Sequence, residues 1–129
     1  MPLAPRTLLA VALGGALGSL LRYAVEVALP ATAGGVPWGT LLVNVAGSAA
    51  LGALVVVLDR GLARTARRGF LTTGLLGGFT TFSAYAVQVA VLSARSPALS
   101  LVYALLTPLL CVGSAWLAAA CVRRHGRRP

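Results

Sequence analysis

The chain has 129 residues, of which 58% are hydrophobic and only 10% are charged, and its mean hydropathy is +0.89. These values lie outside the range of soluble globular domains and place the chain in a lipid bilayer. The net charge of +9 does not indicate a nucleic-acid-binding protein, because the arginines flank apolar segments and no folded basic module is left to carry such binding.

Four apolar segments are each long enough to cross the roughly 30 Å of hydrocarbon in a bilayer. They cover about residues 7–29, 38–58, 69–94 and 98–122, and they predict an all-α integral membrane protein with one domain over residues 1–129. The first segment is also similar to a secretory signal, since Arg6 precedes a short apolar run. Cleavage there would leave an odd number of spans and no soluble domain to export, so we interpret it as a span.

The basic residues are all arginine and gather on one side of the predicted bundle. Those on that side are Arg6, Arg60, Arg64, Arg67, Arg68, Arg123, Arg124, Arg127 and Arg128. Arg95 alone clearly faces the other side. The positive-inside rule therefore predicts that both termini and the 59–68 loop are cytoplasmic.

Acidic residues are almost absent, which limits the chemistry available. Only Glu26 and Asp59 are present, and neither lies at mid-depth in a span. We therefore expect neither an enzyme nor a cation-coupled carrier, because cations that cross a bilayer generally need a buried acid as partner. Arg22 and Glu26 are four residues apart in the first span, and this spacing predicts a neutralised pair on one helical face.

Neutral polar and small residues recur at helical spacing within the spans. Thr40, Asn44 and Ser48 share one face of the second span, and Tyr103, Thr107, Cys111 and nearly Ser114 share one face of the fourth. A hydroxyl bonded to its own helix is the simpler interpretation of any single Ser or Thr. An amide in hydrocarbon needs partners, so Asn44 is the stronger candidate. Close helix packing is predicted at the pairs Gly14/Gly18, Ser48/Gly52 and Gly74/Gly78.

The third span contains LGGFTTFSAYAVQ at residues 76–88, an uncharged stretch with paired glycines and paired threonines. This composition predicts a helix that is broken at mid-membrane, whose freed backbone groups must face protein or water. Broken helices form ion sites, and the aromatic rings that follow have positive edges that suit an anion. The residues alone thus predict a pathway for a small anion.

Three stretches together resemble the Fluc (CrcB-like) fluoride channels. They are GGALGSLLRY (14–23), GTLLVNVAGS (39–48) and TGLLGGFTTFSAY (73–85), on a chain of the same four-span length. The resemblance implies a fluoride-selective channel that exports the toxic anion passively across the bacterial plasma membrane. It also implies an antiparallel dimer with two pores and a structural sodium ion at the dimer centre.

The resemblance also implies roles for individual residues. Phe82 matches the first of two pore rings, Asn44 matches a pore asparagine, and Arg22 matches an arginine near the vestibule. Tyr103, Thr107 and Ser114 are similar to a polar track, and the backbone carbonyls of Gly77 and Thr80 match the sodium site. Two positions depart from the pattern: the second ring, usually Phe, is Tyr85, and the track position after Thr107 is the weak donor Cys111.

The uneven distribution of arginines between the two ends of the bundle predicts the composition of the dimer. An antiparallel homodimer requires one chain to insert both ways, whereas the excess of arginine on one side favours a single orientation. We therefore predict a heterodimer with an oppositely oriented homologue, with a homodimer as the alternative if insertion is dual.

Two other classes of membrane protein share these features. A small multidrug-type four-span exporter has the same length, but it needs a mid-membrane Glu that the stretch from Thr7 to Leu21 lacks. In a non-transporting membrane assembly subunit, the polar stripes would only hold helices together.

Overall fold

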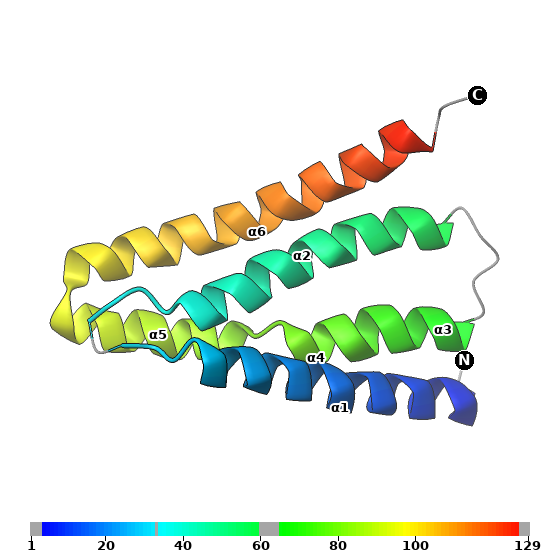
Figure 1. The fold of residues 1–129 in the computed structure, drawn as a ribbon, viewed down its shortest axis with the longest axis horizontal. Helices are drawn as coiled ribbons and strands as arrows, with labels where there is room; N and C mark the ends of the chain where they lie inside the picture. Colours follow the sequence, from blue (N-terminus) through cyan, green and yellow to red (C-terminus); the bar gives the residue numbers. More distant parts are fainter. Residues whose placement is uncertain (1–3, 33, 60–64, 127–129) are drawn as a thin grey trace.

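Four helical segments lie side by side in an up-and-down bundle (Figure 1). The computed structural model describes residues 4–32, 34–59 and 65–126. The segments are α1 (Pro5–Ala28), α2 (Trp38–Asp59), a third segment of α3 (Thr65–Gly69), η1 (Phe70–Leu76), α4 (Gly77–Phe79) and α5 (Phe82–Arg95), and then α6 (Pro97–His125). All four are long and apolar enough to span a membrane, which confirms the predicted multi-pass membrane protein.

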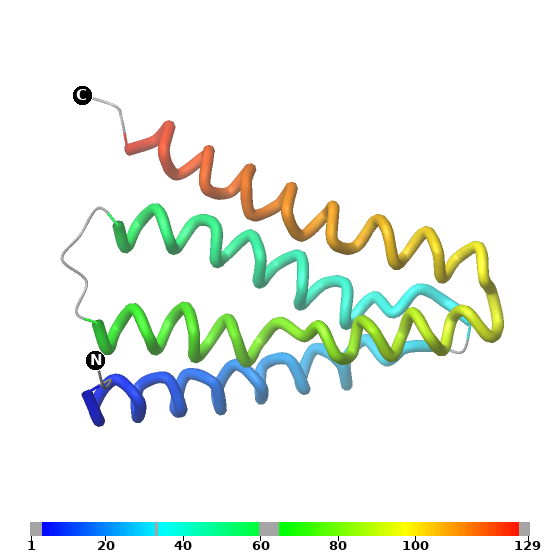
Figure 2. Tube along the Cα trace, turned by 180° about the vertical axis from the view of Figure 1, so that it is seen from behind, coloured from blue at the N-terminus to red at the C-terminus, as the bar shows by residue number. Residues whose placement is uncertain are grey.

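The ends of the helices divide the arginines as the sequence predicts. Figure 2 shows the start of α1, the end of α2, the start of α3 and the end of α6 at the same end of the bundle. Of the described arginines, Arg6, Arg67, Arg68, Arg123 and Arg124 belong to these helix ends, and Arg95 ends α5 at the opposite end. The predicted positions Arg60, Arg64, Arg127 and Arg128 lie outside the described residues.

Glycine faces bring α1 and the third segment into backbone contact. A Cβ atom added at Gly14 or Gly18 would collide with the carbonyl oxygen of Phe70 or Leu75, respectively. In return, a Cβ at Gly74 would lie 2.7 Å from the carbonyl oxygen of Val11. Apolar surface gains little by moving from lipid to protein, so close backbone approach of this kind is what holds such helices together.

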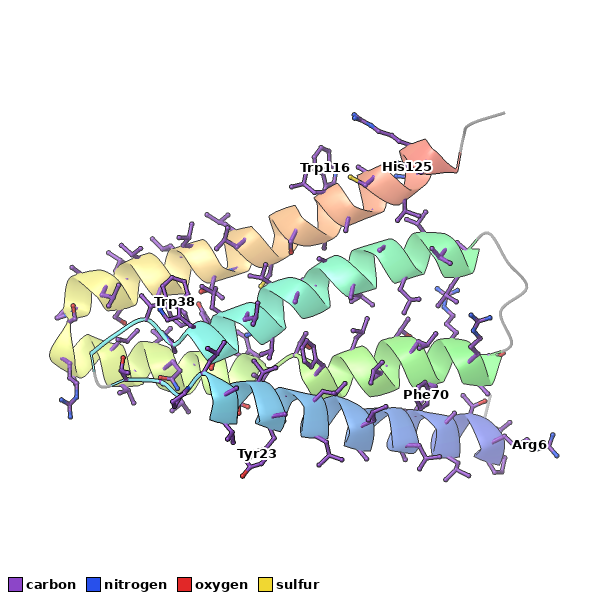
Figure 3. The ribbon with its side chains drawn as sticks, viewed as in Figure 1. Arg6, Tyr23, Trp38, Phe70, Trp116 and His125 are labelled. Atoms are coloured by element: carbon purple, nitrogen blue, oxygen red, sulfur yellow. The ribbon has the colours of Figure 1, made fainter. Side chains whose placement is uncertain are left out.

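A second glycine contact joins α2 to α6. A Cβ at Gly52 would collide with the backbone of Ala115, so these two helices also meet where a small residue permits it. Large side chains lie instead on the outer surface, where Tyr23 and Trp116 point away from the bundle (Figure 3). The bundle thus consists of two glycine-mediated pairs, α1 with the third segment and α2 with α6.

The third segment contains a feature that the sequence analysis did not predict. Phe70–Leu76 forms a π-helix, and the Gly77 N–H that follows it bonds the carbonyl oxygen of Thr72, five residues earlier. Its wider turns lie against α1 at Gly74, where the two backbones touch. Such wide turns are rare and frequently occur at functional sites.

We expect Gly18→Ala to destabilise the protein. The added methyl group overpacks the contact with the Leu75 carbonyl, which lowers the free energy of unfolding by ~1–3 kcal/mol. Gly113→Ala on α6 is the matched control, because a Cβ there has no heavy atom within 4 Å. Thermal unfolding of both variants in detergent measures the difference. Equal midpoints would show that the α1 contact is not a tight one.

Candidate functional site

A cavity with a volume of about 410 Å³ opens between α2, the third segment and α6. Its lining residues are Asn44, Ser48, Thr80, Thr81, Phe82, Tyr85, Thr107, Pro108 and Cys111. Seven of these nine residues are positions that the sequence analysis singled out: Asn44, Ser48, Thr80, Phe82, Tyr85, Thr107 and Cys111. The cavity wall carries no charged side chain.

Two extended residues separate α4 from α5 at this cavity. Thr80 has φ −80° and ψ 156°, and Thr81 has φ −148° and ψ 120°. The Oγ1 atom of Thr81 accepts a hydrogen bond of 3.1 Å from the Ala84 N–H, so Thr81 is the N-cap of α5. A threonine is well suited to this position because its hydroxyl replaces a missing helix acceptor.

Asn44 binds the backbone of this interruption through both ends of its amide. Its Nδ2 donates to the carbonyl oxygen of Thr81 at 2.9 Å, and its Oδ1 accepts from the Thr81 N–H at 2.7 Å. Asn44 is 8% exposed, so these bonds are made away from solvent. The side chain therefore satisfies both polar groups of one non-helical residue and still retains one N–H, since an amide nitrogen carries two.

The same hydrogen bonds leave two carbonyl groups without their helical donors. In a continuous α-helix the N–H groups of Thr81 and Ala84 would bond the carbonyls of Gly77 and Thr80. Here those N–H groups go to Asn44 Oδ1 and to Thr81 Oγ1. Gly77 and Thr80 are the positions at which the resemblance implies carbonyl ligands for sodium.

Aromatic rings continue from the interruption toward α6. The ring centroids of Phe82 and Tyr85 are 5.6 Å apart, as are those of Tyr85 and Tyr103. Phe82 is 79% exposed in the single chain, although it begins α5 at the cavity. The first N–H groups of α5 also lie here, at the positive end of the helix dipole.

The hydroxyl groups of α6 divide into two kinds. Tyr103 Oη and Thr107 Oγ1 are buried and have no hydrogen-bond partner within the described part of the chain. Ser114 Oγ, in contrast, lies 2.9 Å from the carbonyl oxygen of Cys111 and 3.1 Å from that of Val45, and its one hydrogen is shared between these two acceptors. Ser114 therefore links α6 to α2 and is not in the cavity lining, unlike Thr107.

Another, smaller cavity of about 140 Å³ lies at the end of the bundle where α1 ends and α2 begins. Glu26, Thr40 and Gln88 contribute to its lining. Glu26 does not form the expected pair with Arg22: Glu26 Oε1 and Arg22 Nε are both buried without a hydrogen-bond partner among the described residues. The i, i+4 spacing brought the side chains to one face, but the Glu26 side chain lines the cavity instead. Arg22 lines neither cavity.

The comparisons with known proteins identify the family. A family model described as "CrcB-like protein, Camphor Resistance (CrcB)" matches residues 9–119 of the chain. This chain belongs to the CrcB-like family. The predicted resemblance is therefore confirmed, and the family match runs from α1 into α6.

Curated relatives of this CrcB-like chain carry the name of a channel. A "Fluoride-specific ion channel FluC 1" of Streptomyces coelicolor is 46% identical over 117 residues, which cover 88% of this chain and 75% of that protein. A "Fluoride-specific ion channel FluC 2" of Nocardia farcinica is 48% identical over 89 residues, which cover 68% of this chain and 64% of that protein. A "Fluoride-specific ion channel FluC" of Paracoccus denitrificans is 51% identical over 90 residues, or 69% and 71% of the two chains. These names do not favour the multidrug exporter or the assembly subunit.

Two residues of the cavity were missed by sequence reasoning. Thr81 is the partner of Asn44, and Pro108 lies inside α6 at the cavity wall. A proline within a span was a usable signal, because it removes a helix hydrogen bond and must be accommodated nearby. The partner of Asn44 carried no such signal, since 37 residues separate the two.

We expect Asn44→Ala to loosen the α4–α5 interruption. The substitution leaves the buried N–H and carbonyl of Thr81 unpaired, at a cost of ~1–3 kcal/mol. Hydrogen exchange of the peptide that contains Thr81 should accelerate. Ser48→Ala, one turn further along α2 in the same cavity, is the control and should leave this exchange unchanged. Equal protection in both variants would contradict the bridging role of Asn44.

Proposed function

We propose that the chain is a fluoride-selective channel that lets cytoplasmic fluoride leave passively across the bacterial plasma membrane. The observation that carries this proposal is the uncharged cavity in which Asn44, Thr107 and the start of α5 come together. Fluoride is small and strongly hydrated, so it enters only where protein donors replace its water. The family match and the names of the relatives support the same function.

The donors of the proposed anion path come from three helices. Asn44 offers its remaining N–H, and Thr107 and Tyr103 offer hydroxyls without a partner among the described residues. The start of α5 offers the amides of its first turn other than that of Ala84, which bonds Thr81 Oγ1. Phe82 and Tyr85 would present ring edges, which are the positive parts of an aromatic side chain. In this proposal Arg22 attracts the anion toward an entrance, and Ser114 marks the far part of the polar track.

We also propose that the extended residues Thr80 and Thr81 lie near mid-membrane. The stretch from Thr65 to Phe79 on one side and α5 on the other are of similar length, which supports a central position. An interruption at that depth must face protein or an aqueous path, because lipid offers no hydrogen-bond partners. Its place beside the cavity fits this requirement.

A sodium ion at the centre of a dimer is a further part of the proposal. Sodium prefers oxygen ligands, and the Gly77 and Thr80 carbonyls have lost their helical donors to Asn44 and Thr81. In the described residues no group of three or more His, Cys, Asp or Glu side chains could hold a metal, so carbonyl ligands suit this chain. Two such carbonyls from each of the two chains of the dimer would supply four uncharged oxygen ligands.

The exposed cavity supports assembly with a second, antiparallel chain. Phe82 is 79% exposed at a cavity that one chain leaves open, and a partner across this face would cover it. Five of the seven described arginines lie at one end of the bundle, which favours a fixed orientation with both termini in the cytoplasm. We therefore propose a heterodimer with an oppositely biased homologue. Some relatives have names that end in 1 or 2, as expected if a genome encodes two chains of this kind.

Fluoride efflux from liposomes tests the function and the assembly together. We expect no efflux from the chain purified alone and rapid efflux when a homologue from the same genome is co-expressed, with chloride retained in both cases. Efflux from the chain alone would overturn the fixed orientation but support the channel. Absence of efflux from both samples, or equal chloride efflux, would overturn the channel.

The substitution Phe82→Ile in the active assembly distinguishes a pore-lining role of Phe82 from a role in helix packing alone. We expect efflux to fall about tenfold, which corresponds to ~1.4 kcal/mol of lost anion stabilisation, while the assembly stays intact by size-exclusion chromatography. Phe70→Ile is the matched control, because Phe70 packs beside α1 in η1 and does not line the cavity. Loss of assembly in the Phe82 variant alone would contradict the pore role.

The sodium proposal is tested by stability. An ion that binds only the folded assembly raises its unfolding midpoint in proportion to the logarithm of ion concentration once the site is occupied. We expect the midpoint to rise with sodium chloride but not with N-methyl-D-glucamine chloride at equal ionic strength. Identical midpoints in the two salts would refute the site.

A further inference from the structure

A hydrogen bond between α5 and α6 ends on a carbonyl group that the α6 backbone leaves unsatisfied. The Tyr85 Oη donates to the carbonyl oxygen of Ala104 at 2.7 Å. In an α-helix that carbonyl would accept the N–H of the residue four positions later. The residue four positions later is Pro108, which has no N–H.

The position of this carbonyl makes its pairing important. Tyr85 and Pro108 both line the 410 Å³ cavity, so the gap that proline creates in the hydrogen bonds of α6 lies beside the proposed anion path. An unpaired carbonyl in a membrane is costly because lipid offers no donor. Its oxygen also carries partial negative charge, which would oppose an anion in the cavity.

The hydrogen bond also fixes the ring that carries the hydroxyl. Tyr85 lies between Phe82 and Tyr103, with centroid distances of 5.6 Å on both sides and interplanar angles of 47° and 38°. With its hydroxyl bound to Ala104, the ring is held at its tip as well as on its two sides. A phenylalanine would keep the ring contacts but lose the fixed tip.

We propose that Tyr85 is a positioning residue that replaces the backbone donor removed by Pro108. The two residues form a coupled pair across the α5–α6 contact: proline opens an acceptor at the cavity wall, and the tyrosine hydroxyl occupies it. The pair keeps the Ala104 oxygen away from the anion and holds the ring stack in register. The effect on efflux rests on the proposed function, whereas the coupling itself does not.

A double-mutant cycle tests this coupling. In the native background, Tyr85→Phe should raise the equilibrium constant of unfolding, measured at the native transition midpoint, about fivefold, which is the effect of one ordinary buried hydrogen bond. In the Pro108→Ala background the same substitution should change it less than about twofold, because the restored N–H at position 108 now pairs with Ala104. Tyr23→Phe, on the outer face of α1, is the matched control and should have no effect in either background.

Fluoride efflux from the four assemblies gives the second readout. Efflux should fall about fivefold in Tyr85→Phe and return to within about twofold of the native rate in the double variant, which a general loss of packing would not produce. An equal effect of Tyr85→Phe in both backgrounds, on unfolding or on efflux, would overturn the pairing. If no assembly conducts fluoride, the proposed function fails, and the unfolding cycle still decides whether Tyr85 and Pro108 are coupled.

Discussion

The need to pair every backbone polar group inside lipid governs this structure, and the bond between Asn44 and Thr81 is where it is met most directly. Two residues between α4 and α5 leave helical geometry, and a side chain from α2 supplies both of the hydrogen bonds that Thr81 needs. Because these bonds occupy the Thr81 N–H, the carbonyl of Gly77 becomes available to other partners. One amide side chain thus allows a span to open without exposing its backbone to lipid.

The polar contacts of the cavity follow a common rule, in which a side chain from one helix compensates a defect in another. Asn44 compensates the interruption of the third segment, and Tyr85 compensates the proline of α6. Ser114 also connects two helices, since its hydroxyl lies within hydrogen-bonding distance of the Val45 carbonyl in α2 and of the Cys111 carbonyl in its own helix. The hydroxyls of Tyr103 and Thr107 have no such partner among the described residues, which is why the proposed anion path includes them.

Much of this arrangement follows from the sequence. Hydrophobic length predicts four spans, and four-residue spacing places Asn44 and Ser48 at one cavity. The identities of the partners do not follow, because Asn44 and Thr81 are 37 residues apart and meet only after the helices pack. Spacing also wrongly predicted a pair between Arg22 and Glu26, because spacing fixes the helix face on which a side chain begins but not the direction in which a long side chain extends. Neither the residue types nor the hydrophobic period of the third span predicts the π-helix of η1. The tyrosine at position 85, where the resemblance leads one to expect Phe, has a structural partner in the Ala104 carbonyl.

The glycine contacts also constrain how the protein is made. The backbone of α1 meets the third segment and that of α2 meets α6, so the two main pairings interleave along the chain. During synthesis α1 is made before the third segment that packs against it, and α2 is made before α6. Neither half of the chain therefore forms a packed unit by itself. A chain that stops before α6 would leave the Gly52 face of α2 without the Ala115 backbone that packs on it, so the last helix completes the packing of the second.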